Sequence, residues 1–103
     1  MAEIILELDH KNDGVFLISE NGNKLGEMAV GKKGNILTIY HTEIKPGQKG
    51  KGFGEQLFEN MLDYAAKDGS MIRPLCPFVY YQFKKDPQRY SRVWLNAEPQ
   101  MTK

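Results

Sequence analysis

The chain has 103 residues, of which 41% are hydrophobic and 26% charged, and its formal net charge at pH 7 is +1. A chain of this length can build one hydrophobic core, and its composition excludes disordered and fibrous proteins. The nearly balanced charge argues against a general role in binding nucleic acid or membrane surfaces.

The first residues, Met1–Ile5, lack the basic region and the long apolar run of a secretory signal. No stretch approaches the ~20 apolar residues that a membrane span needs. We therefore expect a cytoplasmic protein with no membrane partner. The single cysteine, Cys76, cannot form an internal disulfide, and with only His10 and His41 beside it there is no zinc spacing, so no metal site is expected.

Four strands are predicted between Glu3 and Glu43. Turn signals separate them at Lys11–Gly14, Glu20–Asn23 and Lys32–Asn35. These connections are too short for helices, so the strands form an antiparallel meander. The first strand alternates cleanly, and its apolar face consists of Ile4, Leu6 and Leu8. The fourth strand, Ile36–Thr42, is apolar on both faces, which favours a central place in the sheet.

An amphipathic helix is predicted after the polar, flexible stretch Lys45–Gly52. Apolar residues recur there at helical spacing, namely Phe53, Leu57, Phe58, Met61, Leu62 and Ala65. Lys67 complements the negative end of a helix, and Gly69 suits a left-handed cap, so the helix should stop there. This helix provides the cover that the sheet needs.

A fifth strand, Met71–Leu75, should return parallel to the fourth through a right-handed crossover. Pro77 begins a short aromatic helix that Asp86–Pro87 ends, and a later segment packs back with Tyr90, Val93, Trp94 and Leu95. The expected fold is α+β, with a mixed, mainly antiparallel sheet of about five strands, one helix packed on it and a short C-terminal helix. We expect one domain over residues 1–97 and a mobile tail over residues 98–103.

The loop Lys49–Gly54 carries three glycines at alternate positions directly before the predicted helix. Glycine leaves backbone N–H groups open to a ligand, and a helix start adds unpaired donors and about half a positive charge. We therefore predict that the loop holds the phosphates of a nucleotide-like cofactor. The alternative is a surface loop that only connects strand to helix.

Two common phosphate loops are excluded by their residues. A Walker loop needs Lys and then Ser or Thr after its last glycine, but Phe53 and Gly54 follow Gly52. A dinucleotide fingerprint that starts at Gly50 needs a small residue at position 55, where this chain has Glu55. It also needs a strand immediately before the loop within a parallel sheet, whereas an antiparallel meander is predicted here.

A meander followed by a strand, a glycine-rich loop and a helix resembles the GNAT superfamily of acetyl-CoA-dependent N-acetyltransferases. The loop of that superfamily reads Gln/Arg-x-x-Gly-x-Gly/Ala, and Lys49–Gly54 fits it except that Lys49 replaces the first residue. His41–Glu43 and Pro74–Pro77 resemble the motifs of a very small branch that consists of little beyond the cofactor-binding core. The resemblance covers roughly residues 40–87.

The resemblance implies acetyl-CoA as the cofactor and an amine as the acceptor. The pyrophosphate would lie on the amides of Lys49, Gly50, Lys51, Gly52, Phe53 and Gly54. The pantetheine arm would bind along Thr42, Glu43 and Ile44. The 3′-phosphate would reach a nearby lysine.

The same resemblance brings His41 and Cys76 to one cleft, at the ends of the fourth and fifth strands. Cys76 is expected at a helix N-cap, where the thiolate is favoured and can act as a nucleophile, although a lone cysteine is more often a small buried hydrophobe. His41 is expected as a base toward Cys76 or the amine, or else as a histidine at the edge of the core on the face of Leu37 and Ile39.

Three further side chains are candidates for the chemistry. Glu43 would share the face of His41 if the strand is regular, and would orient it, act as a base, or be a solvated carboxylate. Tyr80 or Tyr81 would protonate the departing CoA thiolate, or would only pack in an aromatic cluster.

The predicted function is N-acetyl transfer, either directly or through acetyl-Cys76. A second hypothesis is a module that binds CoA or acetyl-CoA with little turnover. A third is a small domain whose Lys45, Lys49 and Lys51 bind RNA or DNA, which the near-neutral charge disfavours. The sequence leaves the identity of the amine acceptor and the oligomeric state open.

Overall fold

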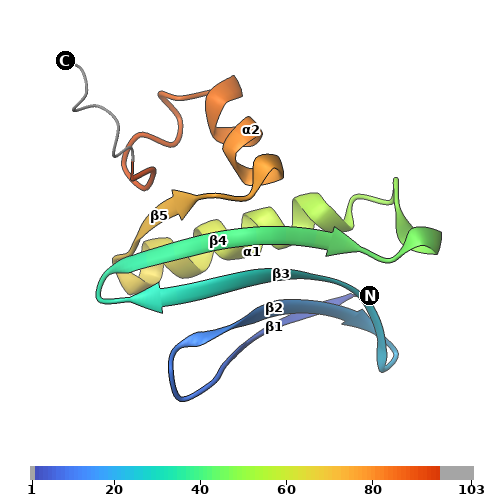
Figure 1. Cartoon of the computed structure of the whole chain (residues 1–103). Coiled ribbons are helices and arrows are strands. Elements are labelled where there is room, and N and C mark those ends of the chain that lie inside the picture. Colours follow the sequence, from blue (N-terminus) through green and yellow to red (C-terminus); the bar gives the residue numbers. More distant parts are fainter. Residues whose placement is uncertain (1, 96–103) are drawn as a thin grey trace.

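The computed structural model describes residues 2–95 and shows one twisted sheet with α1 against one of its faces (Figure 1). The five strands lie in the sheet in the order in which they occur in the chain. They are β1 (Glu3–Leu8), β2 (Asp13–Glu20), β3 (Asn23–Lys33), β4 (Ile36–Ile44) and β5 (Met71–Pro74). The helices are α1 (Phe53–Asp68), α2 (Pro77–Lys85) and a 3-10 turn, η1 (Pro46–Gln48). The tail predicted over residues 98–103 lies outside the described residues.

The pairing of the strands confirms the predicted fold class. β1 to β4 are antiparallel neighbours, and β5 runs parallel to β4 after the crossover through α1. The first turn, residues 9–12, lies two residues earlier than predicted, and the second and third, residues 21–22 and 34–35, are two residues long where four were predicted. Asn12, Asn21 and Gly22 have positive φ angles of 64°, 53° and 80°, which lets the chain reverse within so few residues.

A glycine flanks helix α1 at each end. Gly52 precedes it with φ 84°, and Gly69 follows it with φ 75° and donates its N–H to the carbonyl of Ala65. This confirms the predicted C-terminal cap. Within residues 2–95, neither helix is long and apolar enough to cross a membrane.

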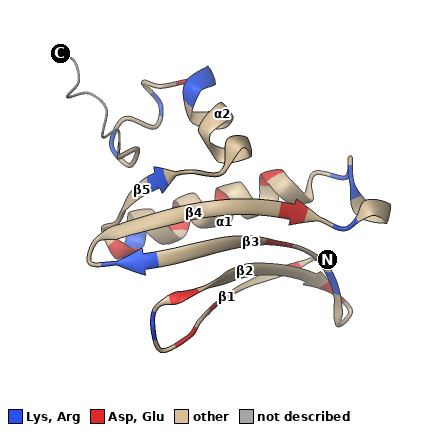
Figure 2. Cartoon of the chain, viewed as in Figure 1, with Lys and Arg blue, Asp and Glu red and all other residues tan. Residues whose placement is uncertain are grey.

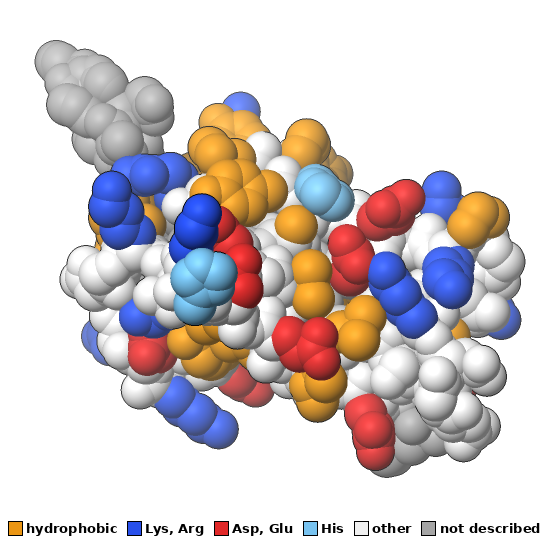
Figure 3. All heavy atoms as spheres, turned by 60° about the horizontal axis from the view of Figure 1, so that its bottom comes forward, with side chains coloured by type: hydrophobic (Ala, Val, Ile, Leu, Met, Phe, Trp, Pro, Cys, Tyr) orange, Lys and Arg blue, Asp and Glu red, His pale blue; other side chains and the backbone are white. Residues whose placement is uncertain are grey.

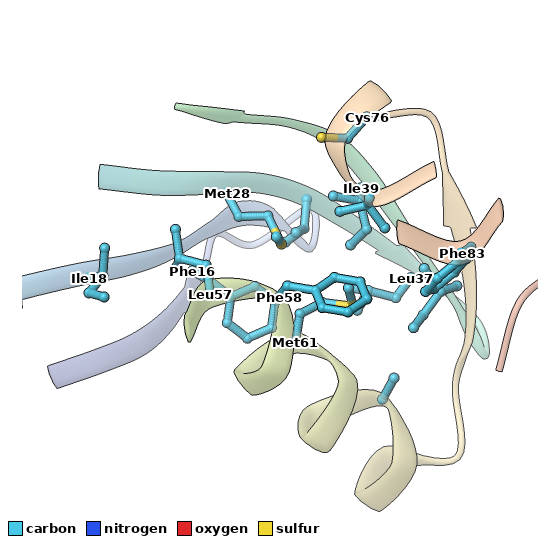
Figure 4. Close-up of a cluster of buried hydrophobic side chains, with 14 of the residues drawn as sticks. Phe16, Ile18, Met28, Leu37, Ile39, Leu57, Phe58, Met61, Cys76 and Phe83 are labelled. Carbon is cyan, nitrogen blue, oxygen red and sulfur yellow. The ribbon is translucent and has the colours of Figure 1, made fainter. Parts of the chain in front are cut away.

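The core lies between α1 and one face of the sheet, with α2 closing one side (Figure 4). Side chains from each layer are at most 3% exposed there: Phe16, Ile18, Met28, Leu37 and Ile39 from the sheet, Leu57, Phe58, Met61 and Ala65 from α1, and Val79 and Phe83 from α2. Burying one large apolar side chain stabilises a fold by about 1.5–3 kcal/mol, so this cluster fixes α1 on the sheet.

The segment after α2 packs back as predicted. Ile72 in β5 donates its N–H to Val93 (2.6 Å) and accepts from the N–H of Leu95 (2.8 Å). The ring of Tyr90 stacks on that of Phe83, with centroids 4.9 Å apart. The segment thereby pairs with the outer edge of β5.

The second face of the sheet, which we call the open face, has no helix over it in the described residues. Strand alternation places Ile5, Val15, Leu17, Ala29, His41 and Glu43 on it. Figure 3 shows hydrophobic side chains on this side of the molecule interspersed with acidic ones. Ile5 is 50% exposed there.

A β-bulge at Tyr40 breaks the alternation of β4. Ala29 pairs with His41 and Val30 pairs with Ile39, so Tyr40 is an extra residue without a partner on β3. Thr42 therefore pairs with the fully buried Met28 and faces α1, as Ile39 does. His41 and Glu43 turn to the open face. The alternative in which His41 is a core-edge histidine on the face of Leu37 and Ile39 is wrong, because it assumed a regular strand.

Candidate functional site

A pocket of about 680 Å³, which we call the loop pocket, opens where β4 ends and α1 begins. Thr42, Glu43 and Ile44 line it from β4, and Lys49, Gly50, Gly52, Phe53 and Gly54 line it from the loop and the first turn of α1. Of the residues predicted to bind the cofactor, the pocket lining lacks only Lys51. The structure thus brings two separate segments of the prediction to one place.

The backbone of the loop leaves several N–H groups unpaired. Gly50 and Gly52 take the left-handed conformation, with φ of 81° and 84°. The first hydrogen bond of α1 runs from the N–H of Gln56 to the carbonyl of Gly52 (3.1 Å). In the described part of the chain no atom accepts from the N–H groups of residues 53–55, which therefore form a donor site for an anion.

Side-chain charge adds little to this donor site. Lys49 lines the pocket, but so do the carboxylates of Glu43 and Glu55. The Lys51 ammonium donates instead to Gln48 Oε1 (3.2 Å). Figure 2 shows both signs of charge at this end of the sheet. The attraction for an anion thus comes mainly from the helix N-terminus and its N–H groups.

Beyond Ile39, the edge of β4 is not covered by β5. The two strands pair only from Ile36 with Met71 to Ile39 with Pro74, after which β5 leaves the sheet. The N–H of Cys76 donates to the carbonyl of Ile39 (2.9 Å), which is the last backbone hydrogen bond between the two segments in the described residues. Residues 40–44 of β4 present a free strand edge that continues into the loop pocket.

Cys76 occupies the N-cap of α2, as predicted, but its side chain makes no capping hydrogen bond. The side chain is only 1% exposed and does not line the loop pocket. Its sulfur lies 3.4 Å from Thr42 Oγ1, and Thr42 does line the pocket. The thiol therefore contacts a residue of the pocket lining but is not itself part of that lining.

His41 and Cys76 do not face one cleft, contrary to the prediction. The bulge at Tyr40 sends His41 to the open face and brings Thr42 to the thiol. His41 is exposed and does not line the loop pocket. Glu43 is the candidate base that lies both on the open face and in the pocket lining.

Tyr80 and Tyr81 are not part of the lining of the loop pocket. They are 44% and 59% exposed. The Tyr80 ring packs edge-on against Trp94, with centroids 6.1 Å apart, and the Lys85 ammonium lies 5.0 Å from the centre of the Tyr81 ring. Their role as an acid stays a prediction.

Four residues that line the pocket were not predicted from the sequence: Pro46, Gln48, Glu55 and Phe78. Phe78 reaches it because α2 packs beside the start of α1, where a Cβ on Gly54 would lie 3.5 Å from Phe78 Cζ. This contact depends on tertiary packing and leaves no local signal. Pro46 and Gln48 form η1, which the polar composition of the loop did not indicate.

Comparison with solved structures shows the same fold in proteins of low sequence identity. A Staphylococcus aureus protein described as GCN5-like matches 91% of this chain and 88% of its own, at 23% identity and a TM-score of 0.63. The ribosomal-protein-S18-alanine N-acetyltransferase of Escherichia coli matches 64% of this chain, at 18% identity and a TM-score of 0.59. N-acetylglutamate synthase of Neisseria gonorrhoeae matches 69%, at 18% identity and a TM-score of 0.51. This chain spans only 43% of the Escherichia enzyme and 19% of the Neisseria enzyme.

Comparison at the level of sequence gives a family. No curated protein sequence matches the chain. The sequence model of the family described as GCN5-related N-acetyl-transferase matches residues 15–93, which include both helices and the whole lining of the loop pocket. Since this match extends over well more than half of the chain, the protein belongs to the GCN5-related N-acetyl-transferase family.

Proposed function

We propose that this protein is an N-acetyltransferase that binds acetyl-CoA in the loop pocket and transfers the acetyl group to an amine. The observation that carries the proposal is the set of unpaired N–H groups at the start of α1, inside a pocket that continues along the free edge of β4. Family membership supports it. The Neisseria structure of the same fold is described as a complex with coenzyme A.

The two parts of the pocket suit the two parts of the cofactor. A pyrophosphate is an anion that helix N-termini bind well, and the N–H groups of residues 53–55 are available for it. The pantetheine arm carries amides that can pair with a free strand edge, which β4 offers over Thr42, Glu43 and Ile44. The acetyl end would then lie near the gap between β4 and the start of α2.

A titration with CoA tests the cofactor. In ¹H–¹⁵N spectra the amides of Phe53, Gly54 and Glu55 should shift to saturation, because a bound phosphate accepts from them. Amides of the β2–β3 turn, residues 21–22, do not line the pocket, serve as an internal control and should stay in place. No binding at millimolar CoA would remove the proposal.

For the chemistry we propose direct transfer. The amine nitrogen attacks the acetyl carbonyl carbon, the C–S bond breaks, and the CoA thiolate leaves while the nitrogen gives up a proton. Glu43 takes this proton in our proposal, because it lies in the pocket lining and on the open face, with His41 as its neighbour there. A Glu43→Gln variant should lose roughly 100-fold in kcat, the low end of general-base effects, with CoA affinity nearly unchanged. A larger loss in His41→Gln than in Glu43→Gln would assign the base to His41.

The covalent route through acetyl-Cys76 is the alternative. It would need the thiol to reach the acetyl carbon, whereas Cys76 is 1% exposed beneath Thr42. The burial of Cys76 supports direct transfer. Turnover that persists in Cys76→Ala, with no acetyl mass on Cys76 in the unaltered chain, is the expected result. An acetylated Cys76 that decays when amine is added would establish the covalent route instead.

A second candidate is a module that binds CoA with little turnover. His41 lies on the open face of β4, whereas Cys76 contacts Thr42 on the face toward α1. This separation of the candidate base from the candidate nucleophile favours such a module. Release of CoA from acetyl-CoA that depends on added amine distinguishes an enzyme from such a module. CoA binding without that release would support the module.

A further inference from the structure

A second hollow of about 600 Å³ lies on the open face, at the opposite end of the sheet from the loop pocket. We call it the hairpin pocket, because the β1–β2 and β3–β4 turns form its rim. Thr38 and Tyr40 of β4 and Arg73 of β5 complete it. The linings of the two pockets share no residue, and where they come nearest along β4, Tyr40 of the hairpin pocket lies over Gly31 on the open face whereas Thr42 of the loop pocket faces α1. The two pockets are therefore separate sites.

The hairpin pocket is basic. Lys11, Lys33 and Arg73 line it, and none of their charged groups forms a hydrogen bond or ion pair within residues 2–95. Lys32 also borders it, but its ammonium is held by Asp68 Oδ2 (3.3 Å) and the carbonyl of Gly34 (2.9 Å). Asp13 contributes one carboxylate. Three free cations minus one carboxylate leave a charge of +2, and Figure 2 shows basic residues on β5, on β3 and in the β1–β2 turn at this end of the sheet.

The floor of the hairpin pocket depends on a glycine and on the bulged residue. A Cβ on Gly31 would lie 2.9 Å from Asp13 Oδ1 and 3.0 Å from the Tyr40 hydroxyl. The absence of a side chain at Gly31 thus lets the Tyr40 ring and the Asp13 carboxylate lie over β3. Tyr40 is still 48% exposed, so the ring and its hydroxyl are available to a ligand.

We propose that the hairpin pocket binds a small organic phosphate. A phosphate monoester carries about −1.5 to −2 charges at pH 7, which matches the charge of the pocket. The guanidinium of Arg73 can hold two phosphate oxygens at once, and the lysines add point charges. The Tyr40 ring and Ile36 provide an apolar wall for the organic part. A volume of about 600 Å³ accommodates such a ligand.

Phenyl phosphate is a suitable probe, because it has one phosphate and one ring and lacks the pyrophosphate and the pantetheine arm of CoA. In ¹H–¹⁵N spectra of the full chain it should shift the amides of Gly31, Gly34 and Arg73 to saturation and leave those of residues 52–55 in place. Lys33→Gln and Arg73→Gln should each weaken binding at least about tenfold, as expected for losing a charge-assisted contact. Both residues are exposed, so these variants should fold, which circular dichroism checks. The matched control is Lys45→Gln, an exposed lysine outside both pockets, which should bind like the unaltered chain.

Four results would overturn this inference. They are no saturation at millimolar phenyl phosphate, shifts confined to residues 52–55, equal losses in Lys33→Gln and Lys45→Gln, and tighter binding of single-stranded DNA than of phenyl phosphate at the same amides. The last result would assign the surface to a nucleic-acid backbone. CoA binding is measured separately at the loop pocket, so a failure of one site leaves the other testable.

Discussion

Gly52, the N-cap of α1, has a left-handed conformation with φ 84° and so sets the direction of the first N–H groups of the helix. A Cβ in this conformation costs about 1–2 kcal/mol, even though no atom lies within 4 Å of its position. Gly52→Ala should therefore lower the free energy of unfolding by about 1 kcal/mol. It should also weaken CoA binding about tenfold, because the helix start is displaced by a few tenths of an ångström. Urea unfolding and calorimetric titration measure the two effects.

Gly47 offers a matched control for this substitution. It lies in η1, close to the same loop, its φ is not positive, and no atom lies within 4 Å of the position that a Cβ would take. Gly47→Ala should leave both stability and CoA affinity nearly unchanged. If the two variants bound CoA equally, the left-handed geometry of Gly52 would not matter for the site.

Local patterns predicted the glycine-rich loop and the helix start, but not the face of His41 or the burial of Cys76. Gly50 and Gly52 stand next to a helical pattern, and both the glycines and the helix start are visible in a few consecutive letters. The face of His41 depends on an extra residue that appears only when β4 pairs with β3. The burial of Cys76 depends on how α2 packs. Neither has a local signature.

Strands β3 and β4 approach closely at Gly26, which pairs with Ile44. A Cβ on Gly26 would lie 2.6 Å from Ile44 Cδ1 and 2.7 Å from the carbonyl oxygen of Glu43. The Ile44 side chain can rotate, but the backbone oxygen cannot. Gly26→Ala should therefore destabilise the protein by about 1–3 kcal/mol, as overpacking does, and weaken CoA binding by moving the end of β4. Urea unfolding checks the first effect and calorimetry the second.

Gly54→Ala is the comparison for this prediction. Its Cβ would meet Phe78 at 3.5 Å, an ordinary contact, and alanine is better than glycine in a helix by about 1 kcal/mol. This variant should unfold at the same or a higher urea concentration. Stability changes of the same sign and size in both variants would contradict the steric argument.

The elements themselves were largely predictable. Turn residues separated the strands, apolar spacing marked α1, and Pro77 marked the start of α2. The errors lie at boundaries, such as Asp13 and Asn23, where positive φ angles at the preceding asparagines and glycine allow strands to start sooner. The sequence pattern does not reveal how tight a turn will be.

For the whole molecule, stability should depend on pH through Asp68 at the end of α1. The Ser70 hydroxyl, and then Lys32 of β3, hold the pKa of the Asp68 carboxyl below its ordinary value of 3.8. A carboxyl whose pKa is lower in the folded state stabilises that state above pH 3.8, and the contribution is lost as the pH falls through the folded-state pKa. Asp68→Asn should therefore be less stable than the unaltered chain at pH 7, with a difference that disappears in stronger acid.

Urea unfolding at a series of pH values measures this difference. Asp63→Asn is the control, because Asp63 lies exposed on the same helix and forms no ion pair within residues 2–95. If the two variants differed from the unaltered chain in the same way at every pH, the link between α1 and β3 through Asp68 would contribute nothing.

Each strand of the sheet lies beside the strand that precedes it in the chain. As the protein leaves the ribosome, β1 to β4 can pair hairpin by hairpin, since each pairing closes only a short loop. The parallel pairing of β5 must wait until α1 has been synthesised, and the loop pocket must wait for Phe78 of α2. During translation the nascent chain therefore acquires most of its sheet well before it can hold a ligand.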